Sequence, residues 1–208
     1  MLRLHHSPFA CSLASRFALA EAAVVHEVVI VRTSHNEHKT EAYLRINPRA
    51  QVPALETDEG VLTESTAILP YIADLAPQKA LFPKPGTFAR SKAQAWLSFL
   101  SSSLHVALTA VMFPREGCDN EVAERACLSR VVAFFRDVDV HLEGREHLLE
   151  SFSVCDLYLA TFALWRAAPA LSGKLPPFSN VDRILHDVLC RPALAPIMGE
   201  ELRLRMDP

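Results

Sequence analysis

Hydrophobic and polar positions follow two different rhythms along the 208-residue chain, and the change between them divides it. In the first part, short runs rich in β-branched residues alternate with stretches of helical periodicity. Strands are predicted there at 2–6, 24–31, 52–56 and 61–63, and helices at 11–22, 41–46 and 66–75. In the second part only helical periodicity remains. Helices are predicted there at 88–112, 121–142, 156–167, 181–189 and 192–204.

The two rhythms predict two domains of different class. The order βαβ, short helix, ββ, helix within 1–77 is typical of an α/β sandwich whose parallel start is followed by an antiparallel end. Residues 78–86 hold two prolines and a glycine directly after Pro77, which is the composition of a linker. Residues 87–208 form an all-helical domain in this prediction. Within it, Ser153 and Asp156 have the spacing of a helix capping box.

Composition and charge narrow the class of protein. Hydrophobic residues make up 50% and charged residues 22%, which is typical of a globular chain. The net charge of −3, without a basic block, argues against nucleic-acid binding. Charged residues interrupt the apolar runs, so we expect no membrane span. The N-terminus has neither the apolar stretch nor the cleavage site of a signal peptide, which predicts a cytoplasmic protein.

Cysteines and histidines give no framework for a disulfide or a metal. The five cysteines are odd in number and form no C-x-x-C pair. The nine histidines lack the spacing of a zinc site. We therefore expect no structural disulfide and no metal ion.

Cys11 is the first candidate for chemistry. It follows a predicted strand and a turn at Pro8, and it opens the next helix. Free N–H groups and the dipole of a helix N-terminus stabilise a thiolate, which favours a reactive cysteine. The alternative is a small buried hydrophobic side chain, as most free cysteines are. Ser12 beside it either caps the helix or donates a hydrogen bond to a bound sulfur.

Two other loops follow strands in the same predicted domain. Pro53 cannot donate to a β-ladder, so a bend with a cis bond fits before it, and the N–H and C=O of Val52 can pair with an extended peptide. Glu64 and Ser65 open a helix, where the N–H groups and the Ser65 hydroxyl fit a carboxylate and Glu64 fits an ammonium group. The alternatives are an ordinary strand start and an ordinary N-cap at Ser65.

A polar stripe runs along the predicted helix 88–112. Its members recur every three or four residues: Gln94, Ser98, Ser101, Ser102, His105 and Thr109. Such a stripe usually faces water. Small hydroxyl residues with one histidine, and without Lys or Glu, fit a ligand cleft better than an open surface.

Four segments, in their order and spacing, resemble the glutathione transferases, and among them the bacterial beta class. They are SPFACSL at 7–13, INPRAQVPAL at 46–55, LTESTAI at 62–68 and SVCDLYL at 153–159, with His105 between the last two. The resemblance extends over most of the chain. It implies a thioredoxin-like glutathione-binding domain over 1–77 and an all-helical domain over 87–208 that forms the acceptor-substrate side of the cleft.

The resemblance also implies roles for the loop residues. Cys11 would lie against the glutathione sulfur, and Val52, before a cis Pro53, would pair with the cysteinyl backbone. Gln51 belongs to the same glutathione-binding loop. Glu64 and Ser65 would bind the γ-glutamyl end.

The predicted helical domain contributes two further residues by resemblance. His105 would reach the sulfur or the glycyl region, and Ser98 stands where beta-class relatives often have Asn. A homodimer, joined through the helix after Ser65 and the long helix that follows, is implied in the same way.

The sequence departs from the family at three further places. His6 stands where the family commonly has Tyr near the thiol, and a histidine changes charge near neutral pH. Phe9 replaces a usual Gly in the first turn. The glycyl carboxylate has no clear basic partner, and the candidates are His35, His38 and Lys39.

The function implied is detoxification by a cytoplasmic glutathione transferase. The site lowers the pKa of the glutathione thiol, and the thiolate attacks a hydrophobic electrophile. Cys11, Ser12, His6 and His105 are the expected stabilisers of that sulfur. One alternative is a glutathione-dependent thiol–disulfide oxidoreductase that uses Cys11. Another is a non-catalytic binding protein with the same fold.

Overall fold

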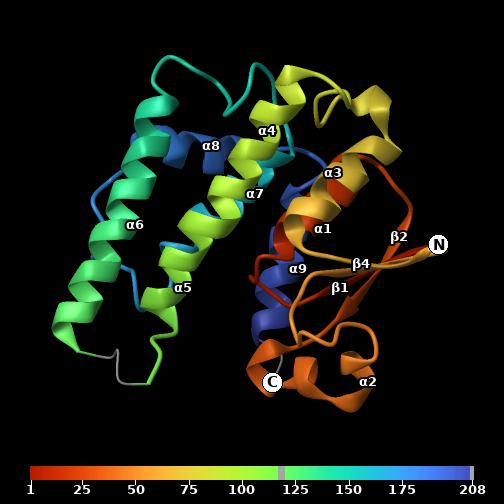
Figure 1. Ribbon diagram of the computed structural model, residues 1–208, viewed down its shortest axis with the longest axis horizontal. Coiled ribbons are helices and arrows are strands. Elements are labelled where there is room, and N and C mark those ends of the chain that lie inside the picture. The colour runs from red at the N-terminus through yellow and green to blue at the C-terminus, as the bar shows by residue number, and fades with distance from the viewer. Residues whose placement is uncertain (117–119, 207–208) are drawn as a thin grey trace. The chain divides into compact units, whose positions relative to one another are not determined.

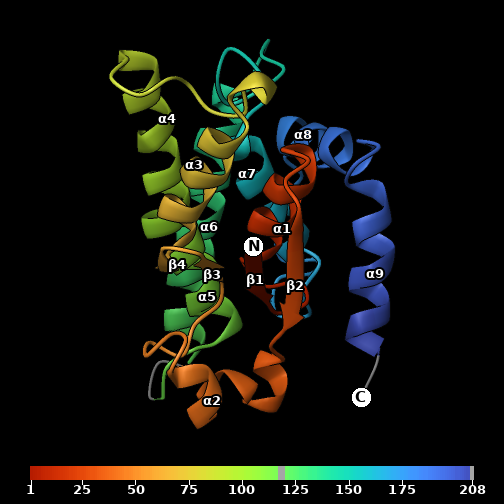
Figure 2. The same ribbon diagram turned by 90° about the vertical axis from the view of Figure 1, so that its right-hand side faces the viewer.

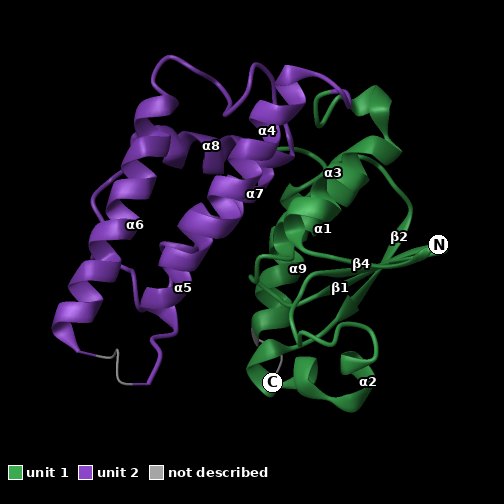
Figure 3. Cartoon of the chain, viewed as in Figure 1, with its two compact units in different colours: residues 1–83, 189–208 green, residues 84–188 purple. Residues whose placement is uncertain are grey.

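The computed structural model describes residues 1–116 and 120–206, which form two compact units. Unit 1 consists of Met1–Pro83 together with the C-terminal segment that begins at Leu189, and unit 2 consists of Lys84–Val188 (Figures 1 and 3). Each unit has its own hydrophobic core.

Unit 1 is built on a four-stranded mixed sheet with strand order β2-β1-β3-β4. Its strands are β1 (Leu2–His6), β2 (His26–Ile30), β3 (Ala54–Thr57) and β4 (Gly60–Thr63). The helical crossover between β1 and β2 makes that pair parallel, and the tight turn between β3 and β4 makes that pair antiparallel. β1 also pairs antiparallel with β3, with Leu4 opposite Leu55. The predicted α/β fold with a parallel start and an antiparallel end is confirmed.

Among the described residues of unit 1, four α-helices accompany this sheet. They are α1 (Leu13–Glu21), α2 (Glu41–Leu44), α3 (Ser65–Leu75) and α9 (Ala195–Met206). Short 3₁₀ turns lie at Thr33–His35, Glu37–Lys39 and Pro77–Lys79. α1 packs against α3, and α9 runs beside α1 (Figure 2). Phe17, Leu55 and Leu69 are fully buried in this unit.

The C-terminal segment groups differently from the sequence-based division, which placed all of 87–208 in the helical domain. In the structure, residues from Leu189 onward belong to unit 1. The physical reason is a set of ion pairs with α1. Arg191 donates to both carboxylate oxygens of Glu21, at 2.7 and 2.8 Å. Arg16 pairs with Glu201 and with its neighbour in α9.

Unit 2 is helical throughout its described elements. These are α4 (Phe88–Phe99), the π-helical segment η4 (Leu100–His105), α5 (Val106–Met112), α6 (Glu121–His141), α7 (Val154–Trp165) and α8 (Ser179–Leu189). α4, η4 and α5 follow one another without a break. α7 is buried along almost its whole length, because apolar residues predominate on every side of the helix. The predicted helical second half is confirmed.

The predicted capping box at the start of α7 is also confirmed. The Asp156 carboxylate accepts from the Ser153 N–H at 2.8 Å, and the Ser153 hydroxyl accepts from the Cys155 N–H at 3.2 Å. Asp156 accepts in addition from the Leu148 N–H at 2.9 Å, which ties the preceding loop to the helix. Ser153 and Asp156 are both buried.

The expectation of interrupted apolar runs was wrong for one helix. No Asp, Glu, Lys or Arg stands between Lys92 and Arg115. The continuous helix Phe88–Met112 has 25 residues and a mean hydropathy of 1.4 in its most apolar window, so its length and composition alone would allow it to cross a membrane. Its segments contact α6 and α7, as the core helix of a globular unit does.

Candidate functional site

The turn between β1 and α1 carries Cys11. Ala10 and Leu13 close this turn with backbone hydrogen bonds, from the Ala10 N–H to Ser7 O and from the Leu13 N–H to Ala10 O, both at 3.0 Å. The Cys11 thiol donates to the carbonyl oxygen of Val52, with an Sγ–O distance of 3.2 Å. The structure thus places the sulfur against the second of the predicted loops.

The electrostatics of Cys11 differ from the expectation drawn from its position. Burial, with a smaller contribution from the carboxylate of Glu64, raises the pKa of the thiol to about 12. Hydrogen bonds from the backbone of Cys11 and Ser12 and from the Ser65 side chain act in the opposite direction but are weaker. Desolvation thus outweighs the donors of the helix start, which in the ligand-free protein favours the alternative of a protonated thiol. In this structure Cys11 is a thiol at neutral pH.

The second loop contains a cis peptide bond between Val52 and Pro53, which confirms the predicted bend. The carbonyl oxygen of Gln51 accepts from the Tyr43 hydroxyl and from the Asn47 side-chain amide, both at 2.7 Å. Val52 and Tyr43 belong to a small buried apolar cluster. The loop is therefore held by side chains beneath it. The Val52 carbonyl, which we expected to be available to a ligand, already accepts the Cys11 thiol.

The third loop joins β4 to α3 at Glu64 and Ser65. Glu64 occupies the N-cap position with φ of 70° and makes no side-chain capping bond, and Ser65 is the first residue of α3. The alternative of an ordinary N-cap at Ser65 is therefore wrong. Ser65 is buried, and both its hydroxyl and the Glu64 carboxylate act on the Cys11 sulfur. The structure brings the third loop to the first.

Left-handed backbone marks all three loops. Phe9 has φ of 56°, Ala50 has φ of 54° and Glu64 has φ of 70°. Non-glycine residues adopt this conformation at a cost, and such strained positions concentrate at functional sites. The convergence of three strained loops on one sulfur points to a binding site in unit 1.

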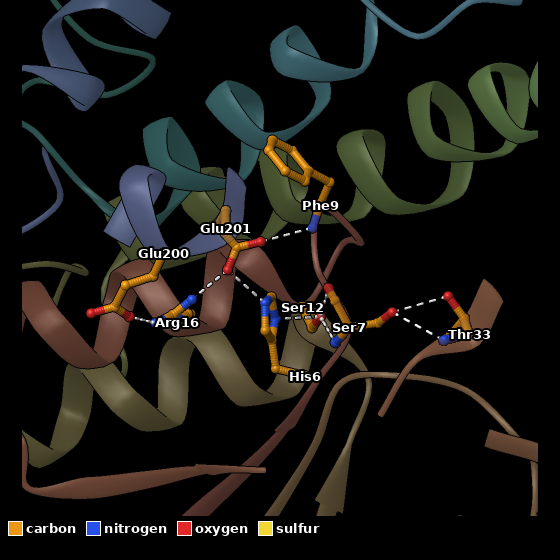
Figure 4. A network of polar contacts seen from close by, with 8 residues as sticks. All are labelled: His6, Ser7, Phe9, Ser12, Arg16, Thr33, Glu200 and Glu201. Carbon is orange, nitrogen blue, oxygen red and sulfur yellow. Dashed lines mark hydrogen bonds and ion pairs between the residues drawn. The ribbon is translucent and has the colours of Figure 1, made fainter. Parts of the chain in front are cut away.

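His6 and Ser12, two expected stabilisers of the sulfur, point elsewhere. Both side chains are fully buried, and His6 Nδ1 lies 2.8 Å from the Ser12 hydroxyl (Figure 4). The Ser12 hydroxyl also contacts the backbone of Ser7, accepting from its N–H at 3.2 Å. A ligand cannot reach groups without exposed surface unless the turn rearranges. The structure assigns these two side chains to an internal network.

The centre of that network is Glu201 of α9. Its carboxylate bonds with His6 Nε2 at 2.7 Å, accepts from the Phe9 N–H at 2.8 Å and accepts from Arg16 at 2.5 Å (Figure 4). Burial alone would raise the pKa of Glu201, but the bonds from His6, Phe9 and Arg16 outweigh it and leave the pKa below its ordinary value. Sequence reasoning missed this residue, since no local pattern links it to a turn 192 positions away.

In unit 2, His105 is the last residue of the π-helical segment η4. Its ring stacks on Phe162 with a centroid distance of 5.2 Å and meets Trp165 edge-on at the same distance. Burial lowers the pKa of His105, which keeps the imidazole neutral at physiological pH. A neutral imidazole both donates and accepts a hydrogen bond.

The polar positions around His105 differ in exposure, and none of the six is fully buried. Three of them are exposed and three are half-buried; the exposed ones are Gln94, Ser98 and Ser102, and the others are Ser101, His105 and Thr109. The segment Leu100–His105 is π-helical, and such segments are frequent at functional sites. The Ser98 carbonyl accepts from the Ser102 hydroxyl at 2.8 Å within the helix.

The candidates for the glycyl carboxylate lie in two 3₁₀ turns after β2. His35 and Lys39 are exposed, whereas His38 is half-buried and its Nδ1 atom has no hydrogen-bond partner. Among residues 1–116 and 120–206, no three His, Cys, Asp or Glu side chains gather as metal ligands would. Cys11, Cys127 and Cys155 are free thiols, and Cys118 lies outside the described residues.

Comparison with known proteins identifies the family. The model of the glutathione S-transferase N-terminal domain matches residues 2–74. The glutathione S-transferase GstA of Escherichia coli O157:H7 is 31% identical over 204 residues, which cover 96% of this chain and 98% of GstA. The chain belongs to the glutathione S-transferase family.

Solved structures of other glutathione transferases agree over the same length. The bacterial beta-class enzyme of Sphingomonas chungbukensis is 33% identical, with a TM-score of 0.85 over 96% of this chain and 98% of its own. A sphingomonad glutathione S-transferase, solved in complex with glutathione, is 35% identical with the same TM-score and coverage. The sheet of unit 1 is therefore the thioredoxin-like part of a glutathione transferase, and the chain is an enzyme of that family.

Proposed function

We propose that this glutathione transferase activates the thiol of glutathione for attack on a hydrophobic electrophilic small molecule in the cytoplasm, as in detoxification. The observation that carries the proposal is the convergence of three loops on the Cys11 sulfur. That sulfur lies 3.2 Å from the Val52 carbonyl, and Glu64 and Ser65 both act on it. The three loops thus offer contacts to the γ-glutamyl end, the cysteinyl backbone and the sulfur of glutathione.

Each loop matches one part of glutathione. The start of α3 offers N–H groups and the Ser65 hydroxyl to the γ-glutamyl carboxylate, and Glu64 offers a counter-charge to its ammonium group. Gln51, Val52 and Pro53 form the edge that pairs with the cysteinyl backbone. The glutathione sulfur then lies against Cys11, where a neutral thiol can donate a hydrogen bond to a thiolate.

Binding of glutathione would itself change the thiol chemistry of this site. The Glu64 carboxylate contributes to the raised pKa of Cys11. An ammonium group beside Glu64 neutralises that charge and removes its contribution. Occupation of the γ-glutamyl site therefore makes the neighbourhood of the sulfur more favourable to negative charge.

The helical unit is assigned the recognition of the second substrate. His105 supports this assignment, because a neutral imidazole held by two aromatic rings is a directional hydrogen-bonding group in apolar surroundings. The support for a role of Ser98 in binding is weaker, since its side chain is exposed. His6 and Ser12 contribute through the shape of the first turn, because both are fully buried.

Thiol–disulfide exchange is the second candidate function. It is favoured by the placement of the Cys11 thiol at the proposed position of the glutathione sulfur. A thiol with a pKa of about 12 is mostly protonated at neutral pH, and it leaves a mixed disulfide slowly. Exchange therefore ranks below conjugation.

The proposed assembly is a homodimer formed through α3 and α4. Large apolar side chains are exposed on these helices: Leu75 on α3 is 44% exposed and Phe88 on α4 is 76% exposed. Burial of such side chains against a second copy would stabilise a dimer. Sedimentation of the wild type and of Phe88→Ser tests the assignment, and a monomeric wild type would remove it.

Calorimetric titration with glutathione tests the proposed site. We expect binding to the wild type, clearly weaker binding to Ser65→Ala, and unchanged binding to Ser172→Ala, an exposed control in unit 2. Absence of binding to the wild type would overturn the proposal and favour a binding protein with another ligand.

The Cys11→Ala variant then separates the two reactions. We expect it to keep conjugation to an aromatic halide and to lose the reduction of a mixed disulfide. Loss of conjugation together with disulfide reduction would move the exchange reaction to first place.

A further inference from the structure

Phe9 occupies a backbone conformation that suits glycine rather than an aromatic residue. Its φ of 56° lies in the left-handed region, where a Cβ atom crowds the following carbonyl. A bulky side chain persists there when its surroundings hold it. The surroundings of Phe9 therefore show what keeps the first turn in shape.

The C-terminal helix α9 holds Phe9 at two points. The Glu201 carboxylate accepts from the Phe9 N–H at 2.8 Å, and the Arg205 guanidinium lies 5.2 Å from the centre of the Phe9 ring. Glu201 and Arg205 are one helical turn apart and so share a face of α9. α9 thus contacts both the backbone and the side chain of Phe9.

Glu201 is itself fixed in place. It is fully buried, and the same carboxylate bonds with Arg16 of α1 and with His6 of β1 (Figure 4). His6 in turn contacts the Ser12 hydroxyl at the far end of the turn. α9 is therefore connected to the turn at Phe9 directly and at Ser12 through His6.

Cys11 lies between these two attachment points. The peptide units around it are hydrogen-bonded on both sides, so a change in the backbone at Phe9 redirects the thiol. The thiol now meets the Val52 carbonyl at 3.2 Å. A turn that relaxed toward the ordinary right-handed backbone at Phe9 would move the sulfur away from that carbonyl and toward solvent.

We propose that Glu201 and Arg205 are positioning residues for Cys11 and act through Phe9, holding its left-handed backbone so that the thiol stays against Val52. The assignment concerns the sulfur site of the proposed function and rests on that function for its catalytic meaning. Its test needs no glutathione, so the two can fail separately.

The test is the rate of alkylation of Cys11 by iodoacetamide, measured as a function of pH by mass spectrometry of the peptide that contains it. We expect Glu201→Gln to raise the rate at neutral pH several-fold and to move the pH profile to lower pH, because the released thiol is better solvated. Arg205→Gln should act in the same direction with a smaller effect. Arg205 is exposed, so this variant keeps the test valid if Glu201→Gln does not fold.

Glu21→Gln is the matched control. Glu21 also ties the C-terminal segment to α1, through Arg191, but it stands at the end of α1 farthest from Cys11. We expect its alkylation profile to equal that of the wild type. An equal rise in this variant would show that general docking of the segment is responsible, and would overturn the proposal.

Phe9→Gly distinguishes action through residue 9 from any other route. Glycine adopts the left-handed backbone without strain, so it does not need the contacts with Glu201 and Arg205 to hold it. In the Phe9→Gly background, Glu201→Gln and Arg205→Gln should change the alkylation profile much less than in the wild type. Effects of the same size in both backgrounds, or no effect of either variant in the wild type, would contradict the proposal.

Discussion

Unit 1 and unit 2 each contain a fully buried carboxylate, and the two are satisfied by different partners. Asp156 of unit 2 accepts from neutral donors, namely the N–H groups of Leu148 and Ser153 and the Ser153 hydroxyl. Glu201 of unit 1 accepts from the Arg16 guanidinium as well as from His6 and a backbone N–H.

The pKa values of the two carboxylates move in opposite directions. Burial raises the pKa of Asp156, and neither its hydrogen bonds nor the nearby His147 overcomes this. Burial also acts on Glu201, but its partners lower the pKa below the ordinary value. Neither carboxylate has exposed surface, and a guanidinium among the donors of Glu201 favours its charged form more than neutral donors would. The first carboxylate caps a helix, and the second joins three elements.

The largest expected loss of stability comes from removing the Glu201 carboxylate, which has a charged partner. Glu201→Ala leaves Arg16 and His6 buried beside an empty position, and loss of one member of a buried ion pair costs about 3–5 kcal/mol. Denaturant unfolding measures the loss. Glu200→Ala is the control, because Glu200 pairs with the same Arg16 but is half-exposed, and we expect it to lose less than about 1 kcal/mol. Equal losses in the two variants would contradict the comparison.

Removal of the Asp156 carboxylate, whose hydrogen-bond donors are neutral, should lower the free energy of unfolding by a smaller amount. Asp156→Ala strands the buried N–H groups of Leu148 and Ser153, which we expect to lower the free energy of unfolding by about 2–3 kcal/mol. Asp156→Asn keeps one acceptor and should lose a smaller part. Unfolding curves measured under identical conditions decide the order. A greater loss for Asp156→Ala than for Glu201→Ala would show that donor charge is not the deciding factor.

The pH dependence of stability should separate the two carboxylates by sign. The contribution of Glu201 is present above its unfolded pKa, near 4.5, and is lost as the pH falls through the lower folded value. The contribution of Asp156 is present below its unfolded pKa, near 3.8, and is lost as the pH rises through the higher folded value. Glu201→Gln should therefore weaken the acid destabilisation of the protein, and Asp156→Asn should strengthen it. Unfolding free energies between about pH 3 and 7 test both signs.

The smallest expected effect is on the alkylation rate of the Cys11 thiol, whose pKa also depends on neighbouring groups. Glu64 raises the pKa of Cys11 and the Ser65 hydroxyl lowers it. Glu64→Gln should therefore speed the alkylation of Cys11 a few-fold at fixed pH, and Ser65→Ala should slow it. Rates that move together in the two variants would mean that access to the sulfur, rather than charge, controls the reaction.

Most of the fold could be predicted from patterns of residues that are close together in the sequence. The βαβ start, the hairpin before Thr63, the cis bond at Pro53 and the capping box at Ser153 each depend on residues close together in the chain. The positions of Cys11, Val52, Glu64 and Ser65 at converging loops also followed from the order of strands and helices, and the structure brings them together.

The features that could not be predicted depend on contacts between residues that are far apart in the sequence. Arg16 meets Glu201 across 185 positions, so neither the grouping of α9 with unit 1 nor the partners of His6 could be read from local patterns. The sign of the Cys11 pKa shift depends on burial, which is a property of the packed molecule. The π-helical segment that ends at His105 is likewise not encoded in the spacing of polar residues.

The discontinuity of unit 1 has a consequence for how the protein is made. A ribosome delivers β1 and α1 early, but their buried groups must wait for α9, which is synthesised after all of unit 2. Until then Arg16 and His6 lack the acceptor that satisfies them in the finished molecule. Unit 2 is continuous in the chain, so its core does not wait for a segment that is distant in the sequence. The part of the protein synthesised first is therefore completed last.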